Sequence, residues 1–140
     1  SSAASDVYKR QEARGEFLET ADVFGLAHYG TPIQPVVEHL EQNVPTVLEI
    51  DIQGARRVKE RAEELGLDVM TVFIAPPSFE ELKRRLIGRG TETAEQQAKR
   101  LETAKIELAA ESEFDVVIVN EVVEDAAAQL WNIIATEFGL

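Results

Sequence analysis

Three short runs of β-branched and apolar residues constrain the fold of this chain more than any other feature. They occupy residues 46–51, 69–74 and 114–120, and stretches with helical periodicity separate them. Strands that are buried on both faces are apolar throughout, and strands that alternate with helices pair in parallel. The order therefore predicts an α/β fold, a parallel sheet with flanking helices. Ahead of it, residues 17–30 alternate loosely in hydropathy and predict a hairpin of two strands.

Capping signals mark where the predicted helices begin. Thr31–Pro32 matches an N-cap followed by proline at the first helical position. Ser78–Glu81 and Thr93–Gln96 each match a capping box, in which a hydroxyl residue is followed three positions later by Glu or Gln. Gly66 is a stop signal for the helix predicted over residues 53–66. A last helix is predicted over residues 124–136.

Cationic residues are concentrated in residues 83–105, against the overall charge. Seven of the fourteen Lys and Arg residues lie there, although the net charge is -12. Arg85 and Arg89 are four positions apart and would share a helix face, and the glycines at 88 and 90 favour a sharp turn before a new helix. Such a helical hairpin could close as a lid, with guanidinium groups that bind phosphate oxygens. The alternative is that these cations pair with acids along solvated helix faces.

Polar side chains stand at the carboxyl ends of two predicted strands. Glu49 and Asp51 end the first run, and Asn120 ends the third. Ionised carboxylates are costly at the end of a buried strand unless they face a pocket or a partner, and open α/β sheets bind ligands at that edge. The alternative is that the two acids bond to neighbouring backbone amides or to Arg56 and Arg57.

Composition excludes several classes of function. A pI near 4.6 disfavours nucleic acid and anionic membranes as partners, and no apolar run approaches the roughly 18 residues of a membrane span. The absence of cysteine excludes disulfides and fits a reducing compartment, so we expect a soluble, cytoplasmic protein. His28 and His39 share no metal-like spacing with other residues, and we expect no protein metal site. Residues 1–11 are polar and without periodicity, and we expect them to be a non-native or disordered leader ahead of a domain over residues 12–140.

Six motifs, in order and spacing, resemble those of the guanylate kinases. The resemblance extends from about Gly15 to the end of the chain. It implies a fold like that of the P-loop kinases, with a small β lobe that binds GMP (residues 15–44), a core (45–78 and 112–140) and a helical lid (79–111). The motifs occupy residues 16–19, 29–31, 48–55, 73–78, 85–93 and 114–120.

The resemblance also implies an activity and roles for particular residues. The activity is transfer of the ATP γ-phosphoryl group to GMP, which yields GDP and ADP, with Mg²⁺ on the nucleotide phosphates. Carboxylates suit guanine, whose N1–H and exocyclic amine are donors. The implied substrate-binding residues are Glu19 and Glu49 for the guanine ring, Thr31 for its O6 side, Tyr29 for the GMP phosphate, and Gly30 between the last two. The implied catalytic residues are Asp51, Arg85, Arg89 and Arg100, and Asn120 would contribute to the adenine-nucleotide pocket.

Two departures from the family pattern qualify the resemblance. Family members often carry Asp at the position of Glu49, whose longer side chain changes the reach of the carboxylate. More importantly, these residues contain no G-x-x-x-x-G-K-[ST] phosphate-binding loop, which the family places at the start of its fold. We therefore expect a chain that lacks its N-terminal part and that is inactive alone. The alternative is a non-catalytic guanylate-kinase-like module that binds phosphopeptides.

Overall fold

The computed structural model describes residues 2–23, 27–87, 90 and 92–140. The fold is α/β, and the chain divides into two compact units, residues 1–69 and 70–140. The division falls inside the predicted core. No helix in the described part of the chain has the length and hydropathy that a membrane span needs.

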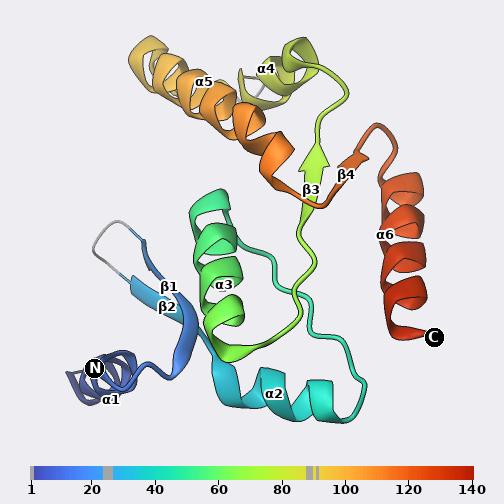
Figure 1. The fold of residues 1–140 in the computed structure, drawn as a ribbon. Helices are drawn as coiled ribbons and strands as arrows, with labels where there is room; N and C mark the ends of the chain where they lie inside the picture. The colour runs from blue at the N-terminus through green and yellow to red at the C-terminus, as the bar shows by residue number, and fades with distance from the viewer. Residues whose placement is uncertain (1, 24–26, 88–89, 91) are drawn as a thin grey trace. The chain divides into compact units, whose positions relative to one another are not determined.

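The first unit is built around an antiparallel hairpin. Strands β1 (Phe17–Val23) and β2 (Ala27–Pro32) pair antiparallel, as predicted, with a register shift between Phe17 and Glu19. Helix α3 (Ile52–Leu65) packs along β1 and buries Val58 and Ala62 with Leu18 of the strand. Figure 1 shows α3 beside the hairpin, with α2 (Ile33–Glu41) directly after β2. This packing fixes β1, which carries Glu19.

The start of α2 differs from the prediction. Thr31 remains in β2, Pro32 is the N-cap without a side-chain hydrogen bond, and the helix begins at Ile33. The Thr31 hydroxyl is directed across the hairpin to Glu19 instead. The Thr31 hydroxyl therefore makes a cross-strand hydrogen bond and does not cap α2.

The segment expected to be a non-native or disordered leader, residues 1–11, is helical where the structure describes it. Helix α1 (Ser2–Ala13) spans them. The ring of Tyr8 lies 5.1 Å from that of Phe17 and 5.5 Å from that of His28, and the Tyr8 hydroxyl donates to the Tyr29 carbonyl at 3.2 Å. One aromatic side chain thus attaches the helix to the hairpin, which a search for apolar periodicity does not detect.

The predicted strand over residues 46–51 does not form. Residues 44–51 have no regular secondary structure, and Val47 is 64% exposed. A strand exists only by pairing, because its N–H and C=O groups need a neighbouring ladder. Among the described residues no strand pairs with this segment. The composition of the segment suits a strand, and the missing ladder explains the difference.

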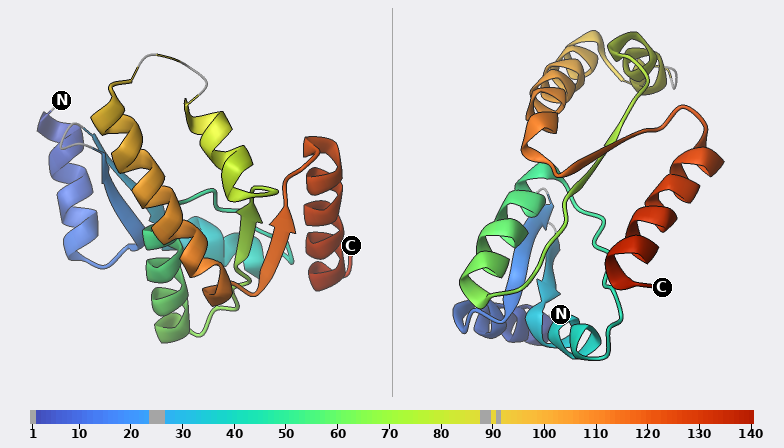
Figure 2. Two further views of the ribbon diagram at one scale, coloured as in Figure 1. Left: turned by 90° about the horizontal axis from the view of Figure 1, so that it is seen from above. Right: turned by 45° about the vertical axis from the view of Figure 1, so that its right-hand side comes forward.

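The second unit is organised on a short parallel pair. Strands β3 (Val72–Ala75) and β4 (Val116–Val119) pair in parallel, with Ile74 opposite Ile118. The carboxylate of Asp115 accepts from the backbone and side chain of Thr71 at 2.9 and 3.0 Å, which aligns the two strands where they begin. Both strands are shorter than predicted. Figure 2 shows β3 and β4 side by side, with α6 (Val123–Phe138) next to β4.

The helices between β3 and β4 begin as predicted. Helix α4 (Phe79–Ile87) has the Ser78 hydroxyl accepting from the Glu81 amide at 3.1 Å. Helix α5 (Ala94–Ala109) carries the full capping box of Thr93 and Gln96, and a 3-10 turn (Ala110–Glu113) follows it. The two helices pack on each other, with the Lys105 ammonium 5.6 Å from the centre of the Phe79 ring. The helical hairpin predicted from the basic segment is present.

Candidate functional site

Glu19 is the buried charged side chain of the hairpin. It is 8% exposed, and its Oε1 accepts a hydrogen bond from the Thr31 hydroxyl at 2.9 Å. Glu19 and Thr31 face each other directly across the β1–β2 ladder. A buried carboxylate is costly unless it is hydrogen-bonded, and the hydroxyl supplies one such bond. The structure therefore brings together two of the residues predicted for guanine.

The geometry of this pair refines the prediction for Thr31. A hydroxyl has one hydrogen to donate, and here that hydrogen points to Glu19. Guanine O6 is an acceptor and needs a donor, so the same hydrogen cannot serve both partners at once. In this arrangement Thr31 acts on Glu19, because it orients the carboxylate.

Tyr29 and Gly30 precede Thr31 in β2. Tyr29 is 61% exposed, as a side chain that binds a solvent-borne anion would be. Gly30 has a packing role, because a Cβ at this position would lie 2.7 Å from the Phe17 ring. The absence of a side chain at residue 30 is therefore required by the hairpin itself.

Glu49 and Asp51 lie on the segment that leads into α3, and both are exposed. Asp51 is the N-cap of α3, and its Oδ1 accepts from the Gly54 amide at 2.7 Å. The Asp51 carboxylate therefore bonds to a neighbouring backbone amide, as one of the alternatives from the sequence predicted. Among the described residues no hydrogen bond or ion pair joins Glu49 to Glu19, Tyr29 or Thr31. The Glu19–Thr31 hydrogen bond therefore does not extend to Glu49 in the described part of the chain.

The acidic residues do not form a protein metal site in the described part of the chain. No group of three or more His, Asp or Glu side chains there has the arrangement to hold an ion. Mg²⁺ in nucleotide enzymes commonly keeps waters and phosphate oxygens and takes only one or two carboxylates. A single exposed carboxylate such as Asp51 fits that mode of binding.

In the second unit, Arg85 lies between a helix carboxylate and the end of β4. Its Nε donates to Glu81 Oε1 at 3.0 Å, and its Nη1 and Nη2 approach the Asn120 carbonyl oxygen at 3.4 and 3.5 Å. The structure therefore brings together Arg85 and Asn120, two of the residues predicted for the nucleotide. The Oδ1 atom of Asn120 is buried and has no hydrogen-bond partner among the described residues.

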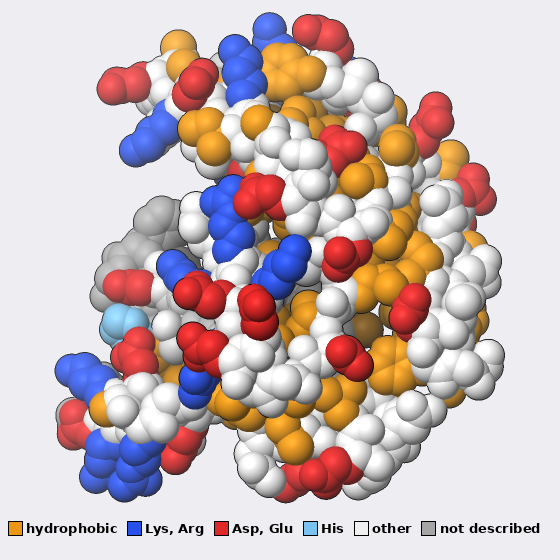
Figure 3. All heavy atoms as spheres, viewed as in Figure 1, with side chains coloured by type: hydrophobic (Ala, Val, Ile, Leu, Met, Phe, Trp, Pro, Cys, Tyr) orange, Lys and Arg blue, Asp and Glu red, His pale blue; other side chains and the backbone are white. Residues whose placement is uncertain are grey.

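Arg100 of α5 pairs with Glu92, an acid just ahead of that helix. Its Nη1 lies 2.6 Å from Glu92 Oε1, while Glu92 Oε2 is buried and finds no hydrogen-bond partner in the part of the chain that the structure describes. With Glu81 holding Arg84 and Arg85, these cations are paired locally, as the alternative of solvated helix faces predicted. Blue and red side chains accordingly lie next to each other over the face drawn in Figure 3. Arg89 lies outside the described residues.

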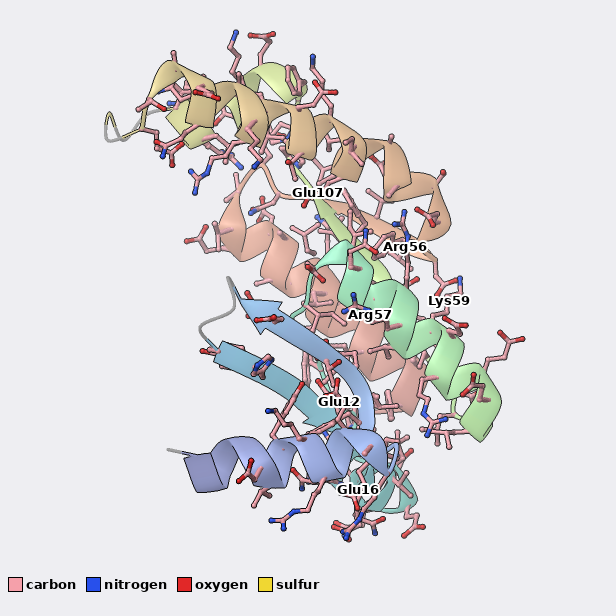
Figure 4. The ribbon with its side chains drawn as sticks, turned by 90° about the vertical axis from the view of Figure 1, so that its left-hand side faces the viewer. Glu12, Glu16, Arg56, Arg57, Lys59 and Glu107 are labelled. Carbon is pink, nitrogen blue, oxygen red and sulfur yellow. The ribbon has the colours of Figure 1, made fainter. Side chains whose placement is uncertain are left out.

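Sequence reasoning missed the residues that support the hairpin and the lid. Arg57 of α3 donates to the Thr20 carbonyl at 2.7 Å, and Arg61 donates to the Gly15 carbonyl at 3.0 Å. Figure 4 shows Arg57 on the side of α3 that faces the hairpin. These bonds span 37 and 46 residues, so no local pattern indicates them. The Glu81 pairs could have been found from their i,i+3 and i,i+4 spacing.

Comparison with known proteins identifies relatives over almost the whole chain. The family model "Guanylate kinase" matches residues 3–137, a range that includes most of α1. Guanylate kinase from Bifidobacterium longum is 73% identical over 135 residues, which cover 96% of this chain and 69% of that protein. Guanylate kinase from Streptomyces kasugaensis is 50% identical over 127 residues, which cover 91% of this chain and 60% of that protein.

A solved structure is also similar. The crystal structure of guanylate kinase from Anaplasma phagocytophilum matches with a TM-score of 0.72 and 36% identity, over 94% of this chain and 61% of that one. The chain thus spans between 60% and 69% of the length of these three relatives.

Proposed function

This chain belongs to the guanylate kinase family, and we propose that it carries the GMP-binding hairpin and the lid of an enzyme that transfers the γ-phosphoryl group of ATP to GMP. The transfer is proposed for the full-length protein that contains these residues, because the relatives are longer. The phosphate-binding loop that cradles the ATP phosphates in such enzymes is absent from these 140 residues. The proposed location is the cytoplasm, because disulfides are rare in that reducing compartment and this chain contains no cysteine to form one.

The observation that carries the proposal is the buried carboxylate of Glu19. A small hairpin gains no stability from a buried ionised acid, so a ligand role explains its presence better than packing does. Guanine offers N1–H and an exocyclic amine as donors, whereas adenine has an acceptor at N1. A fixed acceptor therefore selects guanine. Glu49 would supply the second carboxylate, and Tyr29 would bond the GMP phosphate.

The lid residues would act on the phosphates. Arg85 would exchange the Asn120 carbonyl for a phosphate oxygen, because a charge-assisted bond to a phosphate outcompetes a bond to a neutral carbonyl. Arg89 and Arg100 would bind phosphate oxygens as well. Their positive charge would stabilise the charge that develops on the transferred group while the lid excludes water. Asn120, whose buried Oδ1 has no partner within the described residues, would accept a hydrogen bond from the adenine nucleotide.

Mg²⁺ would accompany ATP. The chemistry that it would supply is neutralisation of part of the negative charge on the ATP phosphates. Asp51 would approach it through the carboxylate oxygen that does not cap α3, since Oδ1 is used by the Gly54 amide. Asp51 would then have two roles, one toward Mg²⁺ and one as the N-cap that fixes the start of α3.

The test is Glu19→Gln in the full-length protein. The amide would present a donor or a weaker acceptor to guanine, so KM for GMP should rise on the order of a hundredfold while KM for ATP stays nearly constant. Steady-state kinetics with each nucleotide varied in turn measures both values. The control is Glu16→Gln, which changes an exposed carboxylate three residues away.

Two outcomes would overturn the proposal. An equal rise of KM for GMP and for ATP in Glu19→Gln would contradict the proposal that Glu19 selects guanine. A full-length wild-type protein that binds neither nucleotide would favour the phosphopeptide-binding alternative.

A further inference from the structure

Glu81 occupies a fixed position in the first turn of α4. Its backbone amide donates to the Ser78 hydroxyl that caps the helix, so its place relative to the helix start is set. Its side chain is 24% exposed, the least exposed of the three side chains in the Glu81–Arg84–Arg85 cluster. The capped turn therefore fixes the backbone from which this carboxylate extends.

The carboxylate binds two consecutive arginines. Arg84 donates to it through two atoms, Nε at 3.0 Å and Nη2 at 2.6 Å, and Arg85 donates through Nε at 3.0 Å. The hydrogen bond from Arg84, together with that from Arg85, holds the pKa of Glu81 below its ordinary value of 4.5. Glu81 is thus ionised at neutral pH and offsets the repulsion between the two neighbouring cations.

Arg85 is held at both ends of its guanidinium group. Glu81 binds Nε, and the Asn120 carbonyl lies near Nη1 and Nη2. The contact with Asn120 joins α4 to the end of β4 across 35 residues, which an ordinary surface pair within one helix does not do. The Nη contacts are long and go to a neutral oxygen, so a phosphate could displace them while Nε stays bound.

We propose that Glu81 is a positioning residue for Arg85, which it holds by Nε so that the two Nη groups are free to exchange the Asn120 carbonyl for a nucleotide phosphate. The proposal rests on the proposed function, because that function gives Arg85 its role. The alternative is that Glu81 and Arg85 form an ordinary surface ion pair, in which removal of one partner has little effect on kcat. The two interpretations differ in what Glu81→Gln does to catalysis.

The test compares Glu81→Gln, Arg85→Ala and the double variant in the full-length protein. Loss of Arg85 should lower kcat by about a hundredfold, as the loss of a group that stabilises transition-state charge does. Glu81→Gln should lower kcat by roughly tenfold with KM for GMP unchanged, because misplacement of a catalytic group acts on the chemical step. The double variant should be no slower than Arg85→Ala, since Glu81 acts through Arg85. Glu81→Asp should restore part of the rate.

The matched control is Glu80→Gln, which removes the same charge from the neighbouring, exposed position in the same helical turn. It should leave kcat within about twofold of the wild type. Equal kcat for the Glu80 and Glu81 variants would overturn the positioning role, and so would additive losses in the double variant.

A readout without catalysis separates this inference from the proposed function. In 15N-labelled protein, the Nε–H signal of Arg85 should be slowly exchanging in the wild type and in Glu80→Gln, and should broaden or vanish in Glu81→Gln. If the wild type transfers no phosphoryl group, the proposed function fails while this signal still tests whether Glu81 holds Arg85. An unchanged signal in Glu81→Gln would contradict the inference whatever the activity.

Discussion

One hydroxyl hydrogen links the two residues at the centre of the hairpin. Thr31 donates it to Glu19, and the direct cross-strand pairing of the two residues sets the 2.9 Å distance. The resemblance to the guanylate kinases associated both residues with guanine, but it did not indicate that Thr31 serves Glu19, because the bond depends on strand register. A one-residue slip would place Thr31 on the opposite face of the hairpin.

Thr31→Val tests this bond with almost no change of shape. Removal of the hydroxyl leaves a buried carboxylate oxygen without its donor, and a hydrogen bond to a charged group contributes about 1.5–3 kcal/mol. We expect KM for GMP to rise about tenfold and Thr31→Ser to remain close to the wild type. Steady-state kinetics with varied GMP measures this, and a Ser variant as poor as Val would show that shape, and not the hydroxyl, matters.

At the scale of elements, α3 holds the hairpin by its arginines. Arg57 and Arg61 are one helical turn apart, and they donate to backbone carbonyls of Thr20 and Gly15, on either side of the buried Leu18 and Glu19. Local signals predicted α3 and its end at Gly66, where φ is +68. They also predicted the turn at Gly90, with φ of +65, and the capping box of α5. Such signals act within a few residues, so the contacts between elements had to come from the structure.

Arg57→Met should loosen the hairpin. Methionine keeps much of the apolar stem and removes the donor to Thr20. Because this bond is exposed to solvent, we take its net contribution as about 1 kcal/mol, below that of a buried bond to a charged group. We expect the free energy of unfolding, measured by urea denaturation, to fall by that amount. Lys59→Met, an exposed position on the same helix, is the control for the loss of one charge. Equal free energies of unfolding for Arg57→Met and Lys59→Met would contradict the role of Arg57 in holding the hairpin.

At the scale of the whole molecule, the difference between sequence and structure lies in the sheets. Residues 46–50 have the composition of a buried strand, yet they form no ladder with the described residues. In the second unit Ile74 and Val119 are about half exposed, although they lie in paired strands. Strand composition is local and could be predicted, whereas pairing depends on the residues that are available to complete a sheet. The pattern in the sequence therefore describes a larger sheet than the one these residues build.

Hydrogen exchange can decide whether residues 46–50 belong to such a sheet. The relatives are longer than this chain, and a strand from the additional residues would pair with the segment and bury the side chain of Val47, which is now 64% exposed. Unpaired backbone amides exchange rapidly, while amides in a central strand exchange only on large-scale opening. We expect amides 46–50 to exchange at least about a hundredfold more slowly in the full-length protein than in the 140-residue chain. The amides of α5, which is already hydrogen-bonded within itself, should change much less and serve as the internal reference. Equal exchange of residues 46–50 in both proteins would mean that the segment is a connector, whose apolar residues then need another explanation.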